Sequence, residues 1–392
     1  MPRLKILVIT NWYPTKEEPS KAVWVREQTK AAGLFDDVLV LHCVEANRSQ
    51  QSSWTIEPEA DEEIRDGVAT YRLHYRRFAV PLSSYFAYLL AVFGAFRYIV
   101  NLGFRPDIIH VHVYDAGAPA ILIGKLHRIP VVISEHFSSF QRGSLRTIDR
   151  LKARTSFRWA NAVFPVSQAL KSAIEGYGMK ARFQVIANVA DTHVFFPMPA
   201  ARESAEQKHV LFVGHLTAAR GLPTLLRSLS KLRTKREDWH LDIVGDGDRR
   251  AETEQLARDL QVCGKVTFHG LKPKSDVAEF MRRADVLVVA SYWETFSVPA
   301  VEALASGTPV LATRCGGPEE YITDEQGLLV APGDEDALCD GLAYMLDHLH
   351  LYSREKISQY AKEHFAPEVV GAKLHASYLS LNDGGRGRRA LR

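Results

Sequence analysis

Two glutamates in the second half of the chain, Glu294 and Glu302, have a spacing that suits a ligand-binding turn. They flank the turn and helix start Thr295-Phe296-Ser297-Val298-Pro299, which follows the apolar run ADVLVVA (284–290). This pattern predicts a buried strand, a tight turn and a helix that opens near Pro299, since proline is accepted in a first helical turn. The N–H groups and dipole of such a helix start favour an anion. Because Glu302 lies about one turn into the helix, both carboxylates can face one crevice. A capped helix with two surface glutamates is the alternative.

A basic loop precedes another helix in the same half. The strand HVLFVG ends at Gly214, and His215 and Arg220 stand between it and Gly221, where the helix opens. A basic side chain beside a helix N-terminus can hold a diphosphate through charge-assisted hydrogen bonds. The alternative is an ordinary surface arginine on a loop between a strand and a helix.

A third glycine-containing strand end, VGDGDRR (244–250), brings Gly245 close to the same region of the predicted sheet. Arg250 occupies the last position of what would be a G-x-G-x-x-G fingerprint, so a nicotinamide cofactor is disfavoured. Asp246 and Asp248 form a D-x-D pair, but two carboxylates alone are weak evidence for Mg²⁺. We therefore expect no metal and no resident cofactor.

His136 follows an apolar strand in the first half, directly after Glu135. From the residues alone, a structural hydrogen-bonding histidine is the better interpretation. His110 and His112 on the preceding strand are interpreted as structural as well. Their spacing with His136 does not support a zinc site.

Short apolar runs alternate with helix-length periodic segments over the whole chain, which indicates parallel sheets covered by helices. Strands are expected near 4–10, 36–42, 107–113, 130–134, 162–166, 183–187, 209–214, 239–244, 265–269, 285–290, 309–313 and 328–330. Helices are expected near 22–33, 83–101, 116–127, 149–160, 167–177, 221–234, 249–262, 275–283, 299–306, 335–347 and 366–381.

The predicted fold class is α/β, with two doubly wound, Rossmann-like domains that face a cleft. Ligands of such sheets bind at the carboxyl ends of the strands. The expected division is a first Rossmann-like domain, an interdomain linker with two prolines, a second Rossmann-like domain, a C-terminal helix that packs back across the joint, and a basic disordered tail. The corresponding ranges are 1–194, 195–208, 209–365, 366–383 and 384–392.

Composition narrows the class of protein. The chain has 392 residues and a net charge of +3, to which the tail GGRGRRALR contributes four arginines, so the remaining body is near neutral. Nucleic-acid binding therefore has little electrostatic support. The four cysteines contain no C-x-x-C pair, which favours reduced thiols and a cytoplasmic location. The apolar start of the chain is too short for a signal-peptide core and is interpreted as a strand.

One segment suggests contact with a membrane. Residues 81–103 are apolar almost all round and rich in aromatics, with Arg72, Arg76 and Arg77 upstream. Since Arg97 interrupts the run, the arginine-free stretch is shorter than the ~20 residues that span a bilayer. A crossover helix buried against the sheet is the first interpretation. The second is peripheral docking on an anionic membrane through residues 72–101, at the inner face of the membrane.

Taken in order, these motifs resemble the retaining GT-B glycosyltransferases of family 4, and the similarity spans nearly the whole chain. It is carried in the second half by VGHLTAARG, VGDGDRR, ETFSVPAVEALASGTPV and GGPEEYITDEQGLLVAPGD, and is most specific at Glu294 and Glu302. The first half matches through NWYPTKEEPSKAVWVREQTKAA, PDIIHVHVYDAG, PVVISEHFSSF, AVFPVSQALK and VIANVADTHVF.

The resemblance implies that the first domain is the acceptor side and that the second binds the nucleotide-sugar, and it implies a role for each candidate residue. Glu302 would bind ribose hydroxyls of the nucleotide, and Arg220 would neutralise the diphosphate with the amides of Ser297 and Val298. Glu294 and the amide of Phe296 would hold the donor sugar. The remaining donor-side positions are Gly214, His215 and Gly245, together with the loop opened by Gly316 and Gly317. His136 would lie near the reacting sugar carbon, so the implied catalytic residues are His136, Glu294 and Arg220.

The chain departs from the family at three places. His215 stands where the family often has arginine, which makes half of the usual basic pair depend on protonation. Ser20-Lys21-Ala22 stands where glycine is frequent, and NVAD (188–191) replaces N-G-V-D. Nothing in the sequence explains the last of these changes.

The expected function is metal-independent, retaining transfer of a sugar from a nucleotide-diphosphate sugar, with UDP or GDP as the nucleotide. The expected acceptor is a glycan or a lipid-linked molecule in cell-surface polysaccharide or glycoconjugate synthesis. Two other classes stay open: a nonhydrolysing sugar-nucleotide epimerase, and a catalytically silent homologue that binds glycans. The epimerase would convert the donor without any acceptor.

Overall fold

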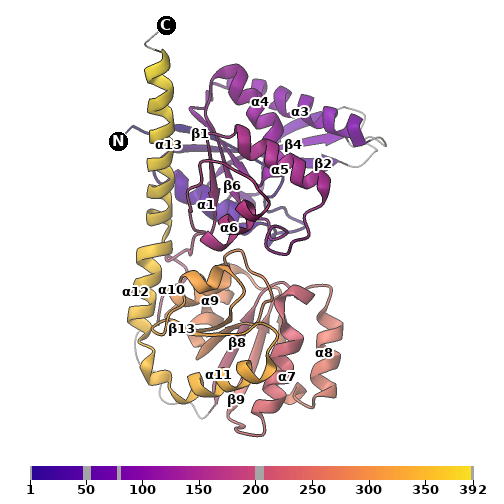
Figure 1. Ribbon diagram of the computed structural model, residues 1–392, viewed down its shortest axis with the longest axis vertical. Coiled ribbons are helices and arrows are strands. Elements are labelled where there is room, and N and C mark those ends of the chain that lie inside the picture. Colours follow the sequence, from indigo (N-terminus) through magenta and orange to yellow (C-terminus); the bar gives the residue numbers. More distant parts are fainter. Residues whose placement is uncertain (1, 47–53, 77–80, 199–206, 390–392) are drawn as a thin grey trace. The chain divides into compact units, whose positions relative to one another are not determined.

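The computed structural model describes residues 2–46, 54–76, 81–198 and 207–389, and the chain divides into two compact units. The first unit comprises Met1–Asn188 and Pro367–Arg392, and the second comprises Val189–Ala366. Each unit contains a sheet with helices, as Figure 1 shows. The predicted α/β fold class of two doubly wound, Rossmann-like domains is confirmed.

The first unit is built on a seven-stranded sheet of order β3-β4-β2-β1-β5-β6-β7. Its neighbouring strands are parallel except for β3, which runs antiparallel to β4. The elements are β1 (Lys5–Thr10), α1 (Val23–Gly33), β2 (Asp37–Ala46), β3 (Trp54–Pro58), α2 (Glu62–Arg65), β4 (Ala69–Arg76), α3 (Pro81–Asn101), β5 (Ile108–His112), α4 (Gly117–His127), β6 (Val131–Glu135), α5 (Thr147–Trp159), β7 (Ala162–Pro165), α6 (Gln168–Gly176) and α13 (Pro367–Arg389).

The second unit is built on a six-stranded sheet of order β10-β9-β8-β11-β12-β13, in which all neighbours are parallel. Its elements are β8 (Lys208–Val213), α7 (Leu222–Leu232), β9 (Trp239–Val244), α8 (Arg250–Asp259), β10 (Val266–Gly270), α9 (Lys274–Arg283), β11 (Val286–Val289), α10 (Val298–Ala305), β12 (Val310–Thr313), β13 (Gly327–Val330), α11 (Glu335–Asp347) and α12 (Arg354–Phe365).

Each sheet has one position where the order of strands reverses. In the first unit this switch point lies between β1 and β5, and in the second it lies between β8 and β11. The helices that follow the two strands of such a pair cover opposite faces, which leaves a crevice at the carboxyl ends of the strands. The loops after β1, β5, β8 and β11 are therefore where ligand-binding residues are expected.

The C-terminal helix α13 returns to the first unit and packs along α1. At Gly371 the two helices approach so closely that a Cβ would overlap the carbonyl oxygen of Ala31. His375 Nδ1 lies 2.9 Å from Asp36 Oδ1, and both side chains are buried. The helix continues to Arg389, so residues 384–389, for which a disordered tail was expected, are helical. Extending an existing helix costs far less than nucleating one, which explains this difference.

The boundary between the units lies at Asn188, a few residues before the predicted 194. Asn188 Oδ1 accepts a hydrogen bond of 3.2 Å from Gln28 of the first unit, whereas Asp191 pairs at 2.7 Å with Lys274 of the second. The carbonyl of Val194 also belongs to the second unit, where it accepts from Arg282. Of the linker expected at 195–208, residues 199–206 lie outside the described residues.

Several elements differ from expectation, among them the short helix α2, which was not predicted. The strand predicted near 183–187 is absent. This segment forms one isolated bridge to β7, between Phe183 and Val163, and Gln184 N donates to Val163 O at 3.0 Å. The strands β3 and β4 and the helix α12 were not predicted. β4 reads ATYRLHYR and is largely polar, so it lacks the apolar run that marks the central strands.

Candidate active site

The loops after β8 and β11 meet at the switch point of the second unit. Gly221, at φ +64°, opens α7, and a Cβ there would overlap the carbonyl oxygen of Ala290 at the end of β11. Tyr292 N donates to Ala219 O at 2.9 Å, which ties the two loops together through their backbones. Glycine is therefore required at this position for the loops to approach.

This approach brings together two side chains that the sequence singled out separately. Arg220 and Glu294 form an ion pair between Nη1 and Oε1. Glu294 is buried, and Ser291 Oγ donates to the same Oε1 at 2.8 Å, which fixes the carboxylate. About a third of the Arg220 side chain is exposed, and burial of the rest lowers the pKa of its guanidinium. A guanidinium has five N–H donors, so it can hold a carboxylate and an anionic ligand together.

The turn that carries Glu294 is held rigidly from both sides. Glu294 N donates to Cys315 O at 2.9 Å, and Gly317 N donates to Glu294 O at 2.8 Å. The Phe296 ring is buried against Tyr321, with ring centroids 5.4 Å apart, and Tyr321 OH donates to Ser297 O at 3.2 Å. The predicted loop at Gly316 and Gly317 thus supports the turn by backbone contact.

Ser297 stands at the start of α10 in the left-handed region, with φ +70°. A residue other than glycine in this region carries strain of about 1–3 kcal/mol, and such strain gathers at ligand-binding turns. Ser297 makes no side-chain cap, and the first N–H groups of a helix lack an intrahelical acceptor. The amides of Ser297 and Val298 therefore lie where an anion can bind.

The other donor-side candidates lie around this core. Gly245 N donates to Gly270 O at 2.9 Å, and Leu216 N donates to Asp246 O at 2.9 Å, so the loop of Gly214 and His215 is tied to the loop after β9. His215 is exposed. Glu302 lies half-buried on α10, one helical turn beyond Val298.

Both carboxylate oxygens of Asp246, in the D-x-D pair, accept hydrogen bonds from the protein. Gly247 N donates to Asp246 Oδ1 at 2.8 Å, and Arg250 Nη1 donates to Asp246 Oδ2 at 3.0 Å. These bonds lower the pKa of Asp246, the backbone bond most. Among the described residues, no group of three or more His, Cys, Asp or Glu side chains could hold a metal ion.

In the first unit, His136 follows β6 and belongs to a buried column of three histidines. The rings of His110 and His112 stack at 4.4 Å between centroids, and those of His112 and His136 at 5.5 Å. His110 is fixed at both nitrogens, 2.7 Å from Tyr378 OH and 2.9 Å from Ser134 Oγ. Burial lowers the pKa of His110 and of His136 to about 3, so the column is neutral at pH 7.

His112 and His136 form a pair, with His112 Nδ1 3.2 Å from His136 Nε2. One of these nitrogens donates and the other accepts, since both rings are neutral. The outer nitrogens, His112 Nε2 and His136 Nδ1, are buried and have no hydrogen-bond partner within the described residues. Whichever tautomer is present, the pair therefore offers one unused donor and one unused acceptor.

Sequence reasoning missed a polar cluster at the switch point between β1 and β5. Asp115 Oδ2 accepts from Asn11 Nδ2 at 3.2 Å and from Trp12 Nε1 at 3.1 Å, and Asn11 Oδ1 accepts from Tyr88 OH at 3.1 Å. Burial raises the pKa of Asp115 to about 6. The available signal was an acid three residues after β5, at the switch point.

Glu135 organises the loop beside this cluster. Its buried carboxylate accepts from the backbone N–H groups of Tyr114, His136 and Phe137 at 2.8–3.1 Å. Burial raises the pKa of Glu135 to about 7, against the opposing effect of these bonds. Glu135 therefore fixes the backbone of His136.

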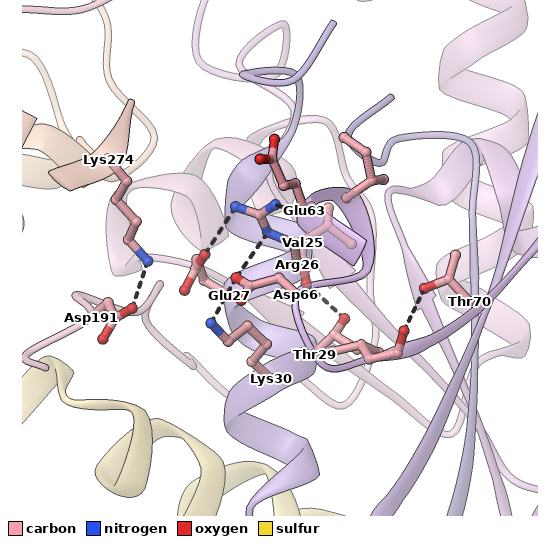
Figure 2. A network of polar contacts seen from close by, with 12 residues as sticks. Val25, Arg26, Glu27, Thr29, Lys30, Glu63, Asp66, Thr70, Asp191 and Lys274 are labelled. Carbon is pink, nitrogen blue, oxygen red and sulfur yellow. Dashed lines mark hydrogen bonds and ion pairs between the residues drawn. The ribbon is translucent and has the colours of Figure 1, made fainter. Parts of the chain in front are cut away.

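Ala22 stands just before α1, in the segment where glycine is frequent in the family. Ala22 precedes α1 in the left-handed region, with φ +50°, where glycine would be unstrained. A charged network then fastens α1 to α2, as Figure 2 shows: Arg26 lies 3.6 Å from Asp66, and Lys30 lies 2.8 Å from it. Arg26 Nη1 also donates to Glu63 O at 3.1 Å.

Comparison with known proteins gives matches along most of the chain. Residues 198–364 match a family model described as Glycosyl transferases group 1, and residues 52–194 match one described as Glycosyltransferase Family 4. An uncharacterized glycosyltransferase of Methanocaldococcus jannaschii is 28% identical over 305 residues, 72% of this chain and 76% of the relative. A D-inositol 3-phosphate glycosyltransferase of Corynebacterium jeikeium is 29% identical over 317 residues, 73% of this chain and 75% of the relative.

The fold is also shared with solved structures. The HepE protein of Anabaena, solved in complex with UDP and glucose, superposes with a TM-score of 0.77 at 18% identity. The match covers 96% of this chain and 100% of HepE. Because two family models together cover both units and the fold agrees over almost the whole length, the chain belongs to the GT-B glycosyltransferases of family 4.

Proposed function

We propose that this glycosyltransferase transfers a sugar, with retention and without a metal ion, from a nucleotide-diphosphate sugar to a glycan or lipid-linked acceptor. The observation that carries the proposal is the pairing of Arg220 with buried Glu294 at the switch point of the second unit, beside the start of α10. HepE, which shares the fold, was solved with UDP and glucose, which supports UDP as the first nucleotide to test.

The donor side supplies charge where the leaving group needs it. Breaking the bond between the sugar and the diphosphate places negative charge on the departing phosphate, which is the main barrier. Arg220 and the amides of Ser297 and Val298 would stabilise that charge, a contribution of ~3–4 kcal/mol for a well-placed donor. Glu294, fixed by Ser291, would accept hydrogen bonds from donor-sugar hydroxyls. Glu302 would bind the ribose.

In the single-step route to retention that we propose, the acceptor hydroxyl attacks the face from which the diphosphate departs. The acceptor oxygen then bonds to the sugar carbon as the carbon–phosphate-oxygen bond breaks, and the hydroxyl proton goes to the departing phosphate oxygen. His136 is neutral at pH 7 because it is buried, so its proposed role is to hydrogen-bond the sugar. It would not carry charge to the reaction.

The proposed setting is the cytoplasm, in cell-surface polysaccharide or glycoconjugate synthesis. All four cysteines are free, and three of them are buried, which fits a reducing compartment. The Corynebacterium relative is named for transfer to a phosphorylated inositol, so a small polar acceptor also belongs in the test set.

Thermal-shift screening with UDP, GDP and ADP, followed by incubation with the matching sugar nucleotides, tests the proposal. A nucleotide that binds the native state raises its melting temperature by mass action. We expect nucleotide release that requires an acceptor and persists in a chelator. Loss of activity in a chelator with recovery in Mg²⁺ would contradict metal independence. Donor conversion without an acceptor would indicate an epimerase, and binding without turnover a silent homologue.

A further inference from the structure

Three neighbouring helices of the first unit expose apolar side chains that nothing in the described part of that unit covers. Leu90 on α3 is 70% exposed, Leu126 on α4 is 69% exposed and Leu151 on α5 is 62% exposed. We call this surface the docking face, and it comprises Phe86, Leu90, Leu122, Leu126, Ile148, Leu151 and Trp159. Scattered exposed apolar residues are ordinary, but a contiguous set indicates an interaction site.

The three helices that carry the docking face are neighbours in the first unit. α4 packs against both α3 and α5, and the three helices lie together on one side of the first sheet in Figure 1. Lys125 of α4 lies 3.1 Å above the exposed ring of Trp159 on α5. Lys152 of α5 lies 5.9 Å from the ring of Tyr85 on α3. Cations therefore stand among the apolar side chains.

These three helices carry far more positive than negative charge. Together they carry six lysine or arginine residues and one acid, Asp149, which pairs with Arg146 at 2.8 Å. The cations are Arg97, Lys125, Arg150, Lys152, Arg154 and Arg158. Arg150 and Arg154 donate to Tyr177 O, so the docking face takes its positive charge from the other four. Of the upstream arginines that the sequence suggested, Arg72 lies on β4, mostly buried and paired with Glu59, so it does not add to this charge. Arg77 lies outside the described residues. Apolar side chains among cations are the composition of an interfacial surface.

The helix α3 lies on the unit and does not leave it. By length and composition, Ser83–Asn101 passes as a candidate membrane span, with a third of that window buried. Its inner side chains Ala91, Val92, Ala95 and Ile99 are fully buried in the unit. Withdrawing them into a bilayer would expose the core, so the outer face alone is available to lipid.

We propose that the docking face binds the surface of an anionic bilayer. Its leucines, isoleucine and aromatics would enter the boundary between headgroups and acyl chains, and its cations would lie at the lipid phosphates. A second copy of the chain is the less favourable occupant, since a symmetric contact would place one set of cations against the same set. The proposal concerns binding alone and does not depend on the reaction or on its acceptor.

Vesicle flotation tests this directly, with phosphatidylcholine vesicles that contain or lack phosphatidylglycerol. We expect binding only to the anionic vesicles, and weaker binding as salt is raised. Leu90→Ser, Leu126→Ser and Leu151→Ser together should abolish flotation, because each buried leucine contributes roughly tenfold to binding. Arg97→Gln with Lys152→Gln should weaken binding by about fivefold for each cation.

The matched control is Leu271→Ser with Leu351→Ser, which removes two leucines of the second unit with similar exposure, 58% and 56%. This control should float like the unaltered protein, and all variants should keep its melting temperature. Absence of flotation with anionic vesicles would overturn the proposal, as would flotation unaffected by the triple substitution. Self-association that the triple substitution abolishes, without vesicle binding, would assign the docking face to a second copy.

Discussion

Replacing Arg220 with alanine separates two roles that the structure gives to one guanidinium. Arg220 is the ion-pair partner of buried Glu294, and it is also the proposed ligand of the leaving diphosphate. Removing a partner from a buried pair costs about 3–5 kcal/mol. Because about a third of Arg220 is exposed, solvent reduces this to roughly 1–2 kcal/mol. For a unit of this size, that corresponds to a fall in melting temperature of roughly 2–8 °C.

The kinetic effect should be much larger than the effect on stability. A lost donor to the developing phosphate charge is worth ~3–4 kcal/mol, so Arg220→Ala should lower kcat about 10²–10³-fold. The assay is release of nucleotide diphosphate at saturating donor and acceptor, with the melting temperature measured in the same buffer. Arg220→Lys should retain part of the activity, since it keeps a charge but loses the planar fork.

A double substitution decides between the two roles. Glu294→Gln removes the carboxylate charge that Arg220→Ala leaves unpaired, so the double variant has no unpaired buried charge. If Arg220 acts on the diphosphate, Arg220→Ala should still lower kcat about 10²–10³-fold in the Glu294→Gln background. If Arg220 only positions Glu294, the double variant should turn over as fast as Glu294→Gln alone. That result would refute the proposed role.

Three further predictions concern binding, strain and acid. Glu302→Ala should weaken binding of the nucleotide by about 1.5–3 kcal/mol, and unchanged affinity by calorimetry would remove Glu302 from the ribose site. Ala22→Gly should raise stability in urea by up to about 1 kcal/mol by relieving the left-handed backbone, whereas the control Ala32→Gly, inside α1, should lower it. The buried histidines have pKa values below those of the unfolded chain, so their contribution to the free energy of unfolding is fully present above pH 6.5. It falls as acid protonates the unfolded state, by about 1.4 kcal/mol per histidine at pH 5.5. His42→Leu should flatten this dependence, because the pKa of buried His42 is also lowered to about 3; an unchanged slope would contradict the assignment.

The second unit was readable from the sequence because its site is built from local pieces. The loops after β8 and β9 carry glycine beside polar residues, and the loop after β11 carries Glu294 before Pro299, so the strand end, the turn and the helix start are visible in short stretches. The pairing of Arg220 with Glu294 was not visible, because it depends on β8 and β11 becoming neighbours. The order of the strands is set by tertiary packing, and it cannot be inferred from the loop sequences alone.

The first unit was harder to read because its polar groups come from distant parts of the chain. His110 meets Tyr378, which lies on α13 at the other end of the sequence. The edge strand β3 and its neighbour β4 were missed for a different reason. Their side chains are largely polar and half-exposed, so the contrast with a loop is weak, and their pairing is antiparallel in a unit that otherwise reads as βαβ repeats.

The candidate site residues of the two units differ in charge. This difference bears on which part of the substrate each unit would bind. The second unit keeps a full cation, Arg220, partly open beside a helix start, which suits a charged diphosphate. In the first unit, the buried groups near His136 are held towards their neutral forms. Burial keeps the histidine column neutral and raises the pKa of Glu135 to about 7. A neutral pair with one unused donor and one unused acceptor suits a hydroxyl, which both donates and accepts. These electrostatics fit the proposal that Arg220 and the start of α10 bind the diphosphate, while the neutral histidine pair of the first unit and Glu294 of the second each hydrogen-bond sugar hydroxyls.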